Sequence, residues 1–196
     1  MFISIEGIDG CGKTTLCNKL SEYLTKKNID HVKTLEPGGT LIANQIREIL
    51  LHSEGLDLKS EILLFLAARA QHVSELIKPA LDQGKWVITD RYSDSFLAYQ
   101  AYGRENDYDL LYKLNDYACY SLYPDKTFYL YIDVETSLAR QTDPDRISST
   151  SEKDFYAKIK QGFDELSQKY SDRFVIIDAT QSIEKVFQDI LNKLNL

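Results

Sequence analysis

The stretch EGIDGCGKTT, residues 6–15, decides the fold of this chain. It satisfies the pattern GxxxxGK[ST] from Gly7 to Thr14 and follows the apolar run FISIE, residues 2–6. A strand, a glycine-rich turn and a helix in this order predict a phosphate-binding loop, because backbone N–H groups turn inward and the helix N-terminus adds positive dipole. Lys13 would reach the terminal phosphates of a nucleotide, and the Thr14 hydroxyl would face Mg²⁺. The predicted loop residues are Gly7, Ile8, Asp9, Gly10, Cys11, Gly12, Lys13, Thr14 and Thr15.

The composition indicates one globular domain. The chain has 196 residues, of which 43% are hydrophobic and 27% charged, which is typical of a folded domain with its own core. Its formal net charge of -7 disfavours general affinity for nucleic acid or anionic lipid. The three cysteines fit no zinc spacing and suit reduced thiols in the cytoplasm. The N-terminus resembles no signal peptide, and the apolar run at 62–68 is far shorter than the roughly 20 residues of a membrane span.

The order of the predicted elements favours an α/β fold. Helical patterns separate five strand-like runs, which indicates a parallel sheet with helices on both faces, in three layers. Residues 57–83 predict one long helix with a kink at Pro79 and an end at Gly84. A polar segment at about 141–154 is either a surface loop or a short lid over the site. The strand-like runs are 2–6, 31–36, 85–90, 127–133 and 174–178.

Charged residues at the ends of the predicted strands indicate a second half of the site. A signalling GTPase is disfavoured, because neither Asn-Lys pair is part of an NKxD motif. Asp90 and Arg91 end the third strand, where open α/β sheets bind ligands, so they could organise Mg²⁺ and grip a phosphate; the alternative is a surface ion pair. Phe65 and Arg69 share a helix face, although core packing would explain Phe65 alone. Together they offer an aromatic ring to a base and a guanidinium to its edge or its phosphate.

The chain resembles the bacterial thymidylate kinases, which are P-loop nucleoside monophosphate kinases, over nearly its whole length. The matching motifs are EGIDGCGKTT (6–15), EPGGT (36–40), LLFLAARAQH (63–72), IKPAL (77–81), VITDRYSDSFLAYQ (87–100) and DRI (145–147). The resemblance implies a P-loop NTPase fold with a five-stranded parallel sheet and a homodimer. It also implies transfer of the ATP γ-phosphate to dTMP with Mg²⁺, giving dTDP.

The resemblance assigns roles to matching positions. Phe65 would stack on thymine and Arg69 would read the edge of the base. Arg91 would hold the dTMP phosphate beside Asp90 and the metal, whereas Asp9 would accept a hydrogen bond from the 3'-hydroxyl. Other residues expected to bind the substrate are Pro37, Arg47, Ser95, Tyr99 and Gln100, with Tyr99 against the 2' position of the sugar.

The phosphate loop contains no arginine, and the resemblance then implies an arginine supplied from the lid. Arg146 is our choice for the transferring phosphate, and Arg140 would lie by adenine; a solvated lid charge is the alternative. Three departures from the family pattern concern the surroundings of the site. Leu35 replaces an arginine common before EPGGT, Phe96 replaces a frequently polar residue near the base, and Ser148 and Ser149 follow DRI where an acidic residue is common.

Three other functions remain to be weighed. A deoxynucleoside kinase would share the loop, the lid and the Asp-Arg motif, but Arg91 and Arg47 favour an acceptor that already carries a phosphate. A nucleotide-binding regulatory module without catalysis is disfavoured by the intact Lys13, Thr14 and Asp90. A DNA-binding ATPase is disfavoured by the net charge.

Overall fold

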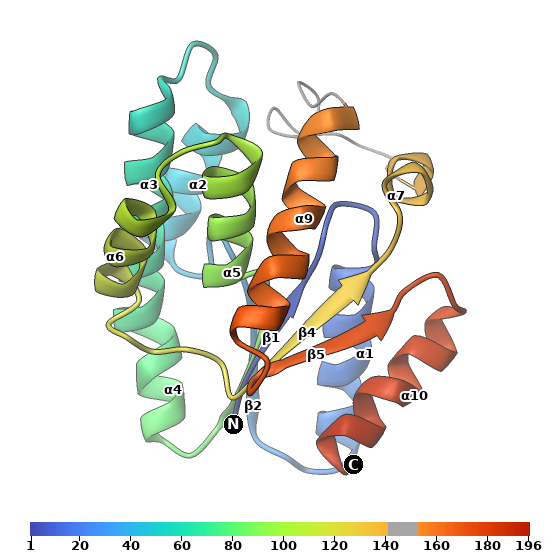
Figure 1. The fold of residues 1–196 in the computed structure, drawn as a ribbon. Helices are drawn as coiled ribbons and strands as arrows, with labels where there is room; N and C mark the ends of the chain where they lie inside the picture. Colours follow the sequence, from blue (N-terminus) through green and yellow to red (C-terminus); the bar gives the residue numbers. More distant parts are fainter. Residues whose placement is uncertain (141–152) are drawn as a thin grey trace.

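The computed structural model describes residues 1–140 and 153–196 (Figure 1). Five strands form a sheet in the order β2-β3-β1-β4-β5, and every pairing is parallel. The predicted strands are confirmed to within two residues at either end. They are β1 (Phe2–Glu6), β2 (His31–Leu35), β3 (Trp86–Asp90), β4 (Lys126–Tyr131) and β5 (Phe174–Asp178).

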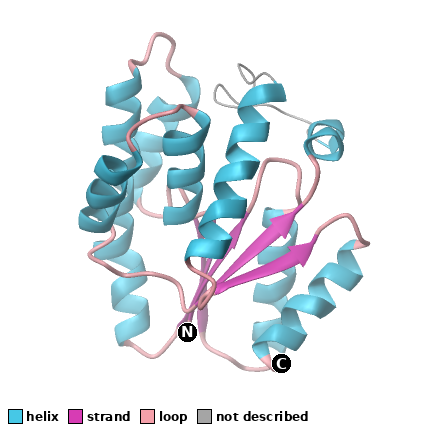
Figure 2. Cartoon of the chain, in the orientation of Figure 1, coloured by secondary structure: helices cyan, strands magenta, loops and turns pink. Residues whose placement is uncertain are grey.

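Helices cover the sheet on both sides, which confirms the three-layer α/β architecture (Figures 1 and 2). On one side α1 (Lys13–Lys26) packs on the central strands and α10 (Ile183–Leu194) packs on β5 and α1. On the other side α4 (Lys78–Asp82) contacts β3, and α9 (Lys153–Lys169) contacts β5. The remaining helical segments are α2 (Leu41–His52), α3 (Leu58–His72), η1 (Val73–Ile77), α5 (Ser93–Phe96), η2 (Leu97–Gly103), α6 (Tyr108–Ala118) and α7 (Val134–Arg140), where η marks π-helical turns.

The central strand is buried along its whole length, because helices lie over both of its faces. Apolar side chains four residues apart on α1, Leu16, Leu20 and Leu24, are fully buried against it. From the opposite layer, Ile159 and Phe163 of α9 enter the same core. The helix stripes predicted around these residues are therefore core, and they fix the loop that follows β1.

The helix predicted over 57–83 is interrupted before Pro79. The regular α3 ends at His72, a π-helical turn follows, and the backbone N–H of Lys78 donates to the carbonyl of Val73, five residues back. Proline has no N–H for an i−4 bond and its ring crowds that carbonyl, so the preceding turn widens. The irregularity predicted at Pro79 thus lies at 73–77, and the end of the segment at Gly84, with φ +76°, is confirmed.

Two helices differ from the sequence patterns. On α2 the apolar side chains do not all enter the core: Leu50 is buried, whereas Ile42 and Ile49 are 47% and 43% exposed. The helix itself is confirmed, and Thr40 caps it by accepting a hydrogen bond from the N–H of Ala43. The sequence patterns do not predict α6, which packs mainly on α3 and η2.

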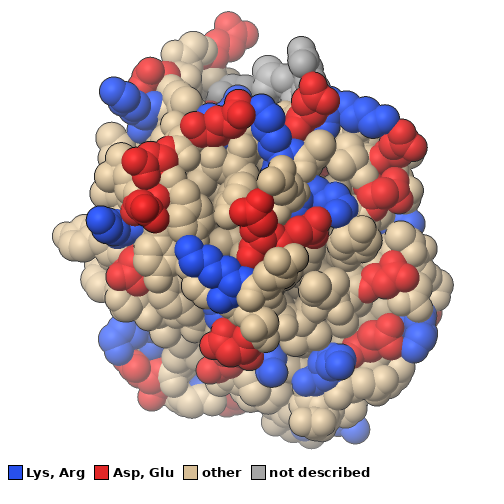
Figure 3. Space-filling view, viewed as in Figure 1, with Lys and Arg blue, Asp and Glu red and all other residues tan. Residues whose placement is uncertain are grey.

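The C-terminal ends of the strands meet at one edge of the sheet, which is the upper edge in Figure 1. There the phosphate loop follows β1 and Arg91 follows β3, so the parallel topology brings the two predicted halves of the site together. On the face seen in Figure 3, acidic and basic side chains are interspersed. Among the described residues, no helix has the length and apolarity needed to cross a bilayer.

Candidate active site

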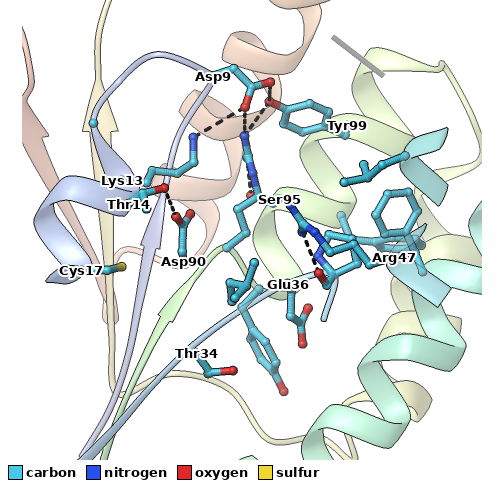
Figure 4. Close-up of a pocket in the computed structure, with 18 of the residues that line it drawn as sticks. Asp9, Lys13, Thr14, Cys17, Thr34, Glu36, Arg47, Asp90, Ser95 and Tyr99 are labelled. Carbon is cyan, nitrogen blue, oxygen red and sulfur yellow. Dashed lines mark hydrogen bonds and ion pairs between the residues drawn. The ribbon is translucent and has the colours of Figure 1, made fainter. Parts of the chain in front are cut away.

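A cavity of about 780 Å³ opens at the C-terminal edge of the sheet (Figure 4), a volume typical of sites for small molecules. Its walls come from the phosphate loop, the end of β2, α2, α3 and the segment after β3. Gly7, Ile8 and Cys11 do not line it, and the side chains of Ile8 and Cys11 are buried beneath the loop. The predicted site residues that line it are Asp9, Gly10, Gly12, Lys13, Thr14, Thr15, Pro37, Arg47, Phe65, Arg69, Asp90, Arg91, Ser95, Tyr99, Gln100 and Arg140.

The phosphate loop has the backbone that an anion site requires. Gly7, Gly10 and Gly12 all have positive φ, and a Cβ on Gly10 would lie 2.4 Å from the backbone oxygen of Ser137. Lys13 is 7% exposed, and its Nζ donates to the carbonyl of Ile8 at 2.9 Å. A phosphate entering the loop would replace that carbonyl as the partner of the ammonium group.

Arg91 joins the phosphate loop to the segment after β3. Its Nη1 donates to the carbonyl of Gly7 at 3.0 Å and to Ser95 Oγ at 3.1 Å. Its Nη2 donates to Asp9 Oδ1 and to the hydroxyl of Tyr99 at 3.1 Å. Arg91 has φ +67°, a left-handed conformation that is uncommon for a non-glycine residue. The guanidinium is therefore held by several acceptors at the wall of the cavity.

Asp9 is neutralised by its neighbours, which accounts for a carboxylate inside an anion-binding loop (Figure 4). Its Oδ2 accepts from the hydroxyls of Tyr99 at 2.9 Å and Tyr156 at 3.3 Å, and Lys13 Nζ lies 3.8 Å from Oδ1. Burial raises the pKa of Asp9, but Arg91, Lys13 and Tyr99 outweigh it and lower the pKa to about 2. The carboxylate is therefore ionised at neutral pH, with two cations beside it.

Thr14 and Asp90 provide oxygen ligands that fit Mg²⁺. Thr14 Oγ1 donates to Asp90 Oδ2 at 2.5 Å, so both side chains point to the same place beside the loop (Figure 4). Among the described residues, no three His, Cys, Asp or Glu side chains gather as a metal cage. Mg²⁺ is commonly held by one or two protein oxygens together with phosphate oxygens, so this donor set suits a nucleotide-bound Mg²⁺.

Arg69 lies in the wall of the cavity in a fixed orientation. It is 3% exposed, and its guanidinium lies 5.3 Å from the ring centres of both Tyr92 and Phe96. Its Nε and Nη2 donate to Glu36 Oε2 at 2.8 and 2.5 Å, and its Nη1 donates to Asn115 Oδ1 at 2.6 Å. Burial lowers the pKa of Arg69, and Glu36 raises it by more, so the guanidinium stays charged.

Two further aromatic and basic side chains face the same part of the cavity. Phe65 packs edge-on against Phe96, with ring centres 6.4 Å apart, and remains partly exposed to the cavity. Arg47 Nη1 donates to the carbonyl of Pro37 at 2.8 Å. The predicted pair Phe65 and Arg69 therefore does lie together on one wall, with Arg47 nearby.

Of the two arginines predicted to act from the lid, Arg140 lies within the described residues and Arg146 does not. Arg140 ends α7, and its Nη1 donates to the carbonyl of Ala179 at 3.1 Å, next to the turn before α10. Arg146 and the serines at 148 and 149 lie outside the described residues, as does nearly all of the predicted lid.

Several residues of the site were missed in the sequence. Glu36 is part of the EPGGT motif, but the motif does not indicate that this residue forms an ion pair with Arg69. Asn115 interrupts the apolar pattern LLYKLNDYA at 110–118, which is a detectable signal for a buried polar contact. No local signal marks Ser137, whose hydroxyl donates to the backbone oxygen of Asp9 from α7. The contact between Ser137 and Asp9 joins residues that are 128 positions apart in the sequence.

Comparisons with known proteins place this site in a family. A sequence model of the family described as thymidylate kinase matches residues 5–190. The chain is 44% identical to the thymidylate kinase of Fervidobacterium nodosum, covering 100% of this chain and 98% of that protein. It is 46% identical to the thymidylate kinase of Leuconostoc mesenteroides subsp. mesenteroides, covering 96% of this chain and 92% of that protein.

A solved structure gives the same result for the fold. The crystal structure of thymidylate kinase from Ehrlichia chaffeensis matches with a TM-score of 0.84 and 36% sequence identity, covering 99% of this chain and 98% of that one. Since the family model and these relatives extend over nearly all of its length, the chain belongs to the thymidylate kinase family.

Proposed function

We propose that this chain transfers the γ-phosphoryl group of ATP to the phosphate of dTMP, giving dTDP. One observation carries the proposal: Arg91, a cation suited to a phosphate, is bonded to Asp9 of the phosphate loop, so donor and acceptor sites share one wall. Membership of the thymidylate kinase family supports the same reaction and an ATP-dependent phosphotransferase.

The donor side consists of the loop and the start of α1. The backbone N–H groups of the loop would hold the ATP phosphates, and Lys13 would leave the carbonyl of Ile8 to contact the β and γ phosphates. Thr14 and Asp90 would hold Mg²⁺, directly or through water. A Mg²⁺ ion held by these two side chains would supply positive charge to the phosphates of ATP. Arg140, close to the turn at Ala179, would lie beside adenine.

The acceptor side consists of the segment after β3 and the wall of α3. Arg91 would bind the dTMP phosphate, and Asp9 would accept a hydrogen bond from the 3'-hydroxyl. Phe65 would stack on thymine while Arg69, which can only donate, would face a carbonyl of the base. Tyr99 would lie against the 2' position of the sugar. Supporting contacts would come from Pro37, Arg47, Ser95 and Gln100, all of which line the cavity.

Phosphoryl transfer depends on positioning and on charge neutralisation, so an arginine near the transferring group is expected. The loop has none, and we assign this role to Arg146, which makes the enzyme a type with its arginine in the lid. Arg91 is already bonded to Asp9 and Gly7 on the acceptor side. Arg146 could therefore contact the γ phosphate while Arg91 stays on the acceptor phosphate.

We also propose a homodimer. Five apolar side chains are 36% to 74% exposed on α2 and α3, two helices that pack on each other. We call this set the α2–α3 face: Leu41, Ile42, Ile49, Leu58 and Leu63. Exposed apolar groups at this density favour contact with a second copy of the chain.

The three cysteines are buried and unpaired, which supports the cytoplasmic location expected from the sequence.

The reaction is tested by a coupled assay of ADP release with ATP and Mg²⁺, run against a panel of acceptors. The panel contains dTMP, dUMP, dCMP and thymidine. Activity is expected with dTMP, and weaker activity with dUMP. ADP release that needs thymidine and not dTMP would instead make the chain a deoxynucleoside kinase, and release independent of any acceptor would make it an ATPase.

A further inference from the structure

Glu6, the last residue of β1, is a carboxyl group buried directly beneath the phosphate loop. It is fully inaccessible, and no cation forms an ion pair with it among the described residues. Its Oε2 accepts a hydrogen bond from Ser95 Oγ, whereas its Oε1 has no hydrogen-bond partner in the described part of the chain. A buried carboxylate with a single hydroxyl partner would be strongly destabilised, but a neutral carboxylic acid in this place would not.

Ser95 connects Glu6 to the acceptor site. Its hydroxyl donates a hydrogen bond to Glu6 Oε2 and accepts one from Arg91 Nη1 at 3.1 Å. The other amino group of the same guanidinium contacts Asp9. A change of charge on Glu6 is thus one hydroxyl away from the arginine proposed to hold the acceptor phosphate.

The surroundings favour the protonated form of Glu6. Burial and the nearby carboxylate of Asp94 raise the pKa of Glu6 to about 8, although Ser95, Arg91 and Arg69 lower it in part. Arg173 donates to both carboxylate oxygens of Asp94, at 2.6 and 2.7 Å. The groups that face Glu6 are Asp94 and Ser95 of α5, Arg91 after β3, Arg69 of α3, Arg173 before β5 and Tyr129 of β4. From α1, the buried thiol of Cys17 has a pKa that the charge of Glu6 helps to raise.

We propose that Glu6 is uncharged when dTMP binds, and that its ionisation weakens the hold of Arg91 on the acceptor phosphate. Glu6 is thus a positioning residue that acts through Ser95, and the inference rests on the proposed role of Arg91. Asp9 is the one carboxylate bonded to the Arg91 guanidinium among the described residues. When Glu6 is uncharged, no negative charge from Glu6 adds to that of Asp9. An ionised Glu6 would add a second negative charge beside it and would repel the phosphate dianion.

The test measures dTMP affinity by isothermal titration calorimetry with the full chain, without ATP, at several pH values. Between about pH 7 and about pH 9, wild-type affinity is expected to fall at least about fivefold, as one neighbouring group ionises. In Glu6→Gln, an amide of the same shape that cannot ionise, the change over this range is expected to stay within about twofold. Cys17→Ser is the matched control, since the Cys17 thiol is another buried titratable group whose pKa is influenced by Glu6; the loss at high pH is expected to persist in this variant.

A fall in affinity that is equally steep in Glu6→Gln, or that disappears in Cys17→Ser, would overturn the inference. Should the glutamine variant not fold, wild-type titrations near pH 8 in two buffers of different ionisation enthalpy give the number of protons taken up on binding. Net uptake supports the inference, and zero uptake overturns it. A wild-type chain with no dTMP affinity at pH 7 would contradict the proposed function as well, whereas affinity with a flat pH profile contradicts the inference alone.

Discussion

Arg91 and Asp9 show how single residues join the phosphate loop to the segment after β3. The guanidinium donates to the carboxylate of Asp9, to Tyr99 and to Ser95, so its position follows from the residues around it. Lys13 lies 3.8 Å from the same carboxylate on the other side. Asp9 therefore lies between Lys13, the cation proposed to bind the donor, and Arg91, the cation proposed to bind the acceptor.

An arginine that acts on the transferring phosphate should affect the rate more than binding. Arg146→Ala is expected to lower kcat by at least about 100-fold with a modest change in the KM for dTMP, because its contact strengthens in the transition state. Arg140→Ala is the matched comparison, and its main effect is expected on the KM for ATP. Steady-state kinetics with both substrates varied measure this, and a near-normal kcat in Arg146→Ala would refute the assignment.

Buried Glu6 should also be visible in the pH dependence of stability. Its pKa is about 8 in the folded chain against an ordinary 4.5, so between these values the unfolded chain loses a proton that the folded chain keeps. The free energy of unfolding should therefore decrease with rising pH, by at most about 1.4 kcal/mol per pH unit from this group. Glu6→Gln removes this loss, and its stability relative to wild type should rise by roughly 3 kcal/mol from about pH 5 to about pH 7.5.

Urea unfolding of both proteins at the two pH values gives that difference. Other groups titrate equally in the two proteins, so they cancel in the comparison. A stability difference that is the same at both pH values would mean that Glu6 ionises alike in the folded and unfolded chains.

At the level of elements, the turn between β2 and α2 is shaped by a glycine that tolerates no side chain. Gly39 has φ +90°, and a Cβ there would lie 2.4 Å from His72 Nε2 and 2.5 Å from Thr34 Oγ1, which are hydrogen-bonded to each other. Gly39→Ala is expected to destabilise the chain by about 2 to 4 kcal/mol, through backbone strain and displacement of that buried pair.

Gly55→Ala is the matched control, since Gly55 also has a positive φ, +68°, but nothing lies within 4 Å of its Cβ position. Strain alone should cost it about 1 kcal/mol. Urea denaturation at one pH compares the two variants, and equal losses would show that the contact with His72 and Thr34 is unimportant.

The helices and strands also show which parts of the fold can be predicted from sequence patterns. All five strands and the loop after β1 were predictable, because buried parallel strands are continuous apolar runs and the loop needs glycines at fixed positions. The short α6 was missed, since its main contacts are with the helical segments α3 and η2. Glu6 was not singled out either, because its partner Ser95 lies 89 residues away and only the fold brings them together.

At the level of the whole molecule, the strand order explains where the site lies. β1 stands between β3 and β4, so the chain moves to opposite sides of β1 and leaves a crevice at the C-terminal edge. The phosphate loop and Arg91 enter that crevice from adjacent strands. Fold membership alone would not reveal the acceptor, which depends on the side chains placed there.

The proposed homodimer gives a prediction at this scale. Leu63→Glu places a charge in the α2–α3 face, where Leu63 is 60% exposed, and is expected to shift the chain from dimer to monomer in sedimentation velocity. Ile176→Glu is the control, because Ile176 is 57% exposed on β5, away from that face. A monomeric wild type, or equal behaviour of the two variants, would contradict the assignment of the interface.

The proposed function depends most on one loop that serves both substrates, with Asp9 facing the acceptor. The direct measurement is the affinity of wild type and Asp9→Asn for dTMP and for 3'-deoxy-dTMP. We expect the 3'-hydroxyl to contribute about tenfold to wild-type affinity and almost nothing in the variant, because its charged partner is gone. Equal weakening of both nucleotides by Asp9→Asn would show that this carboxylate does not hold the sugar.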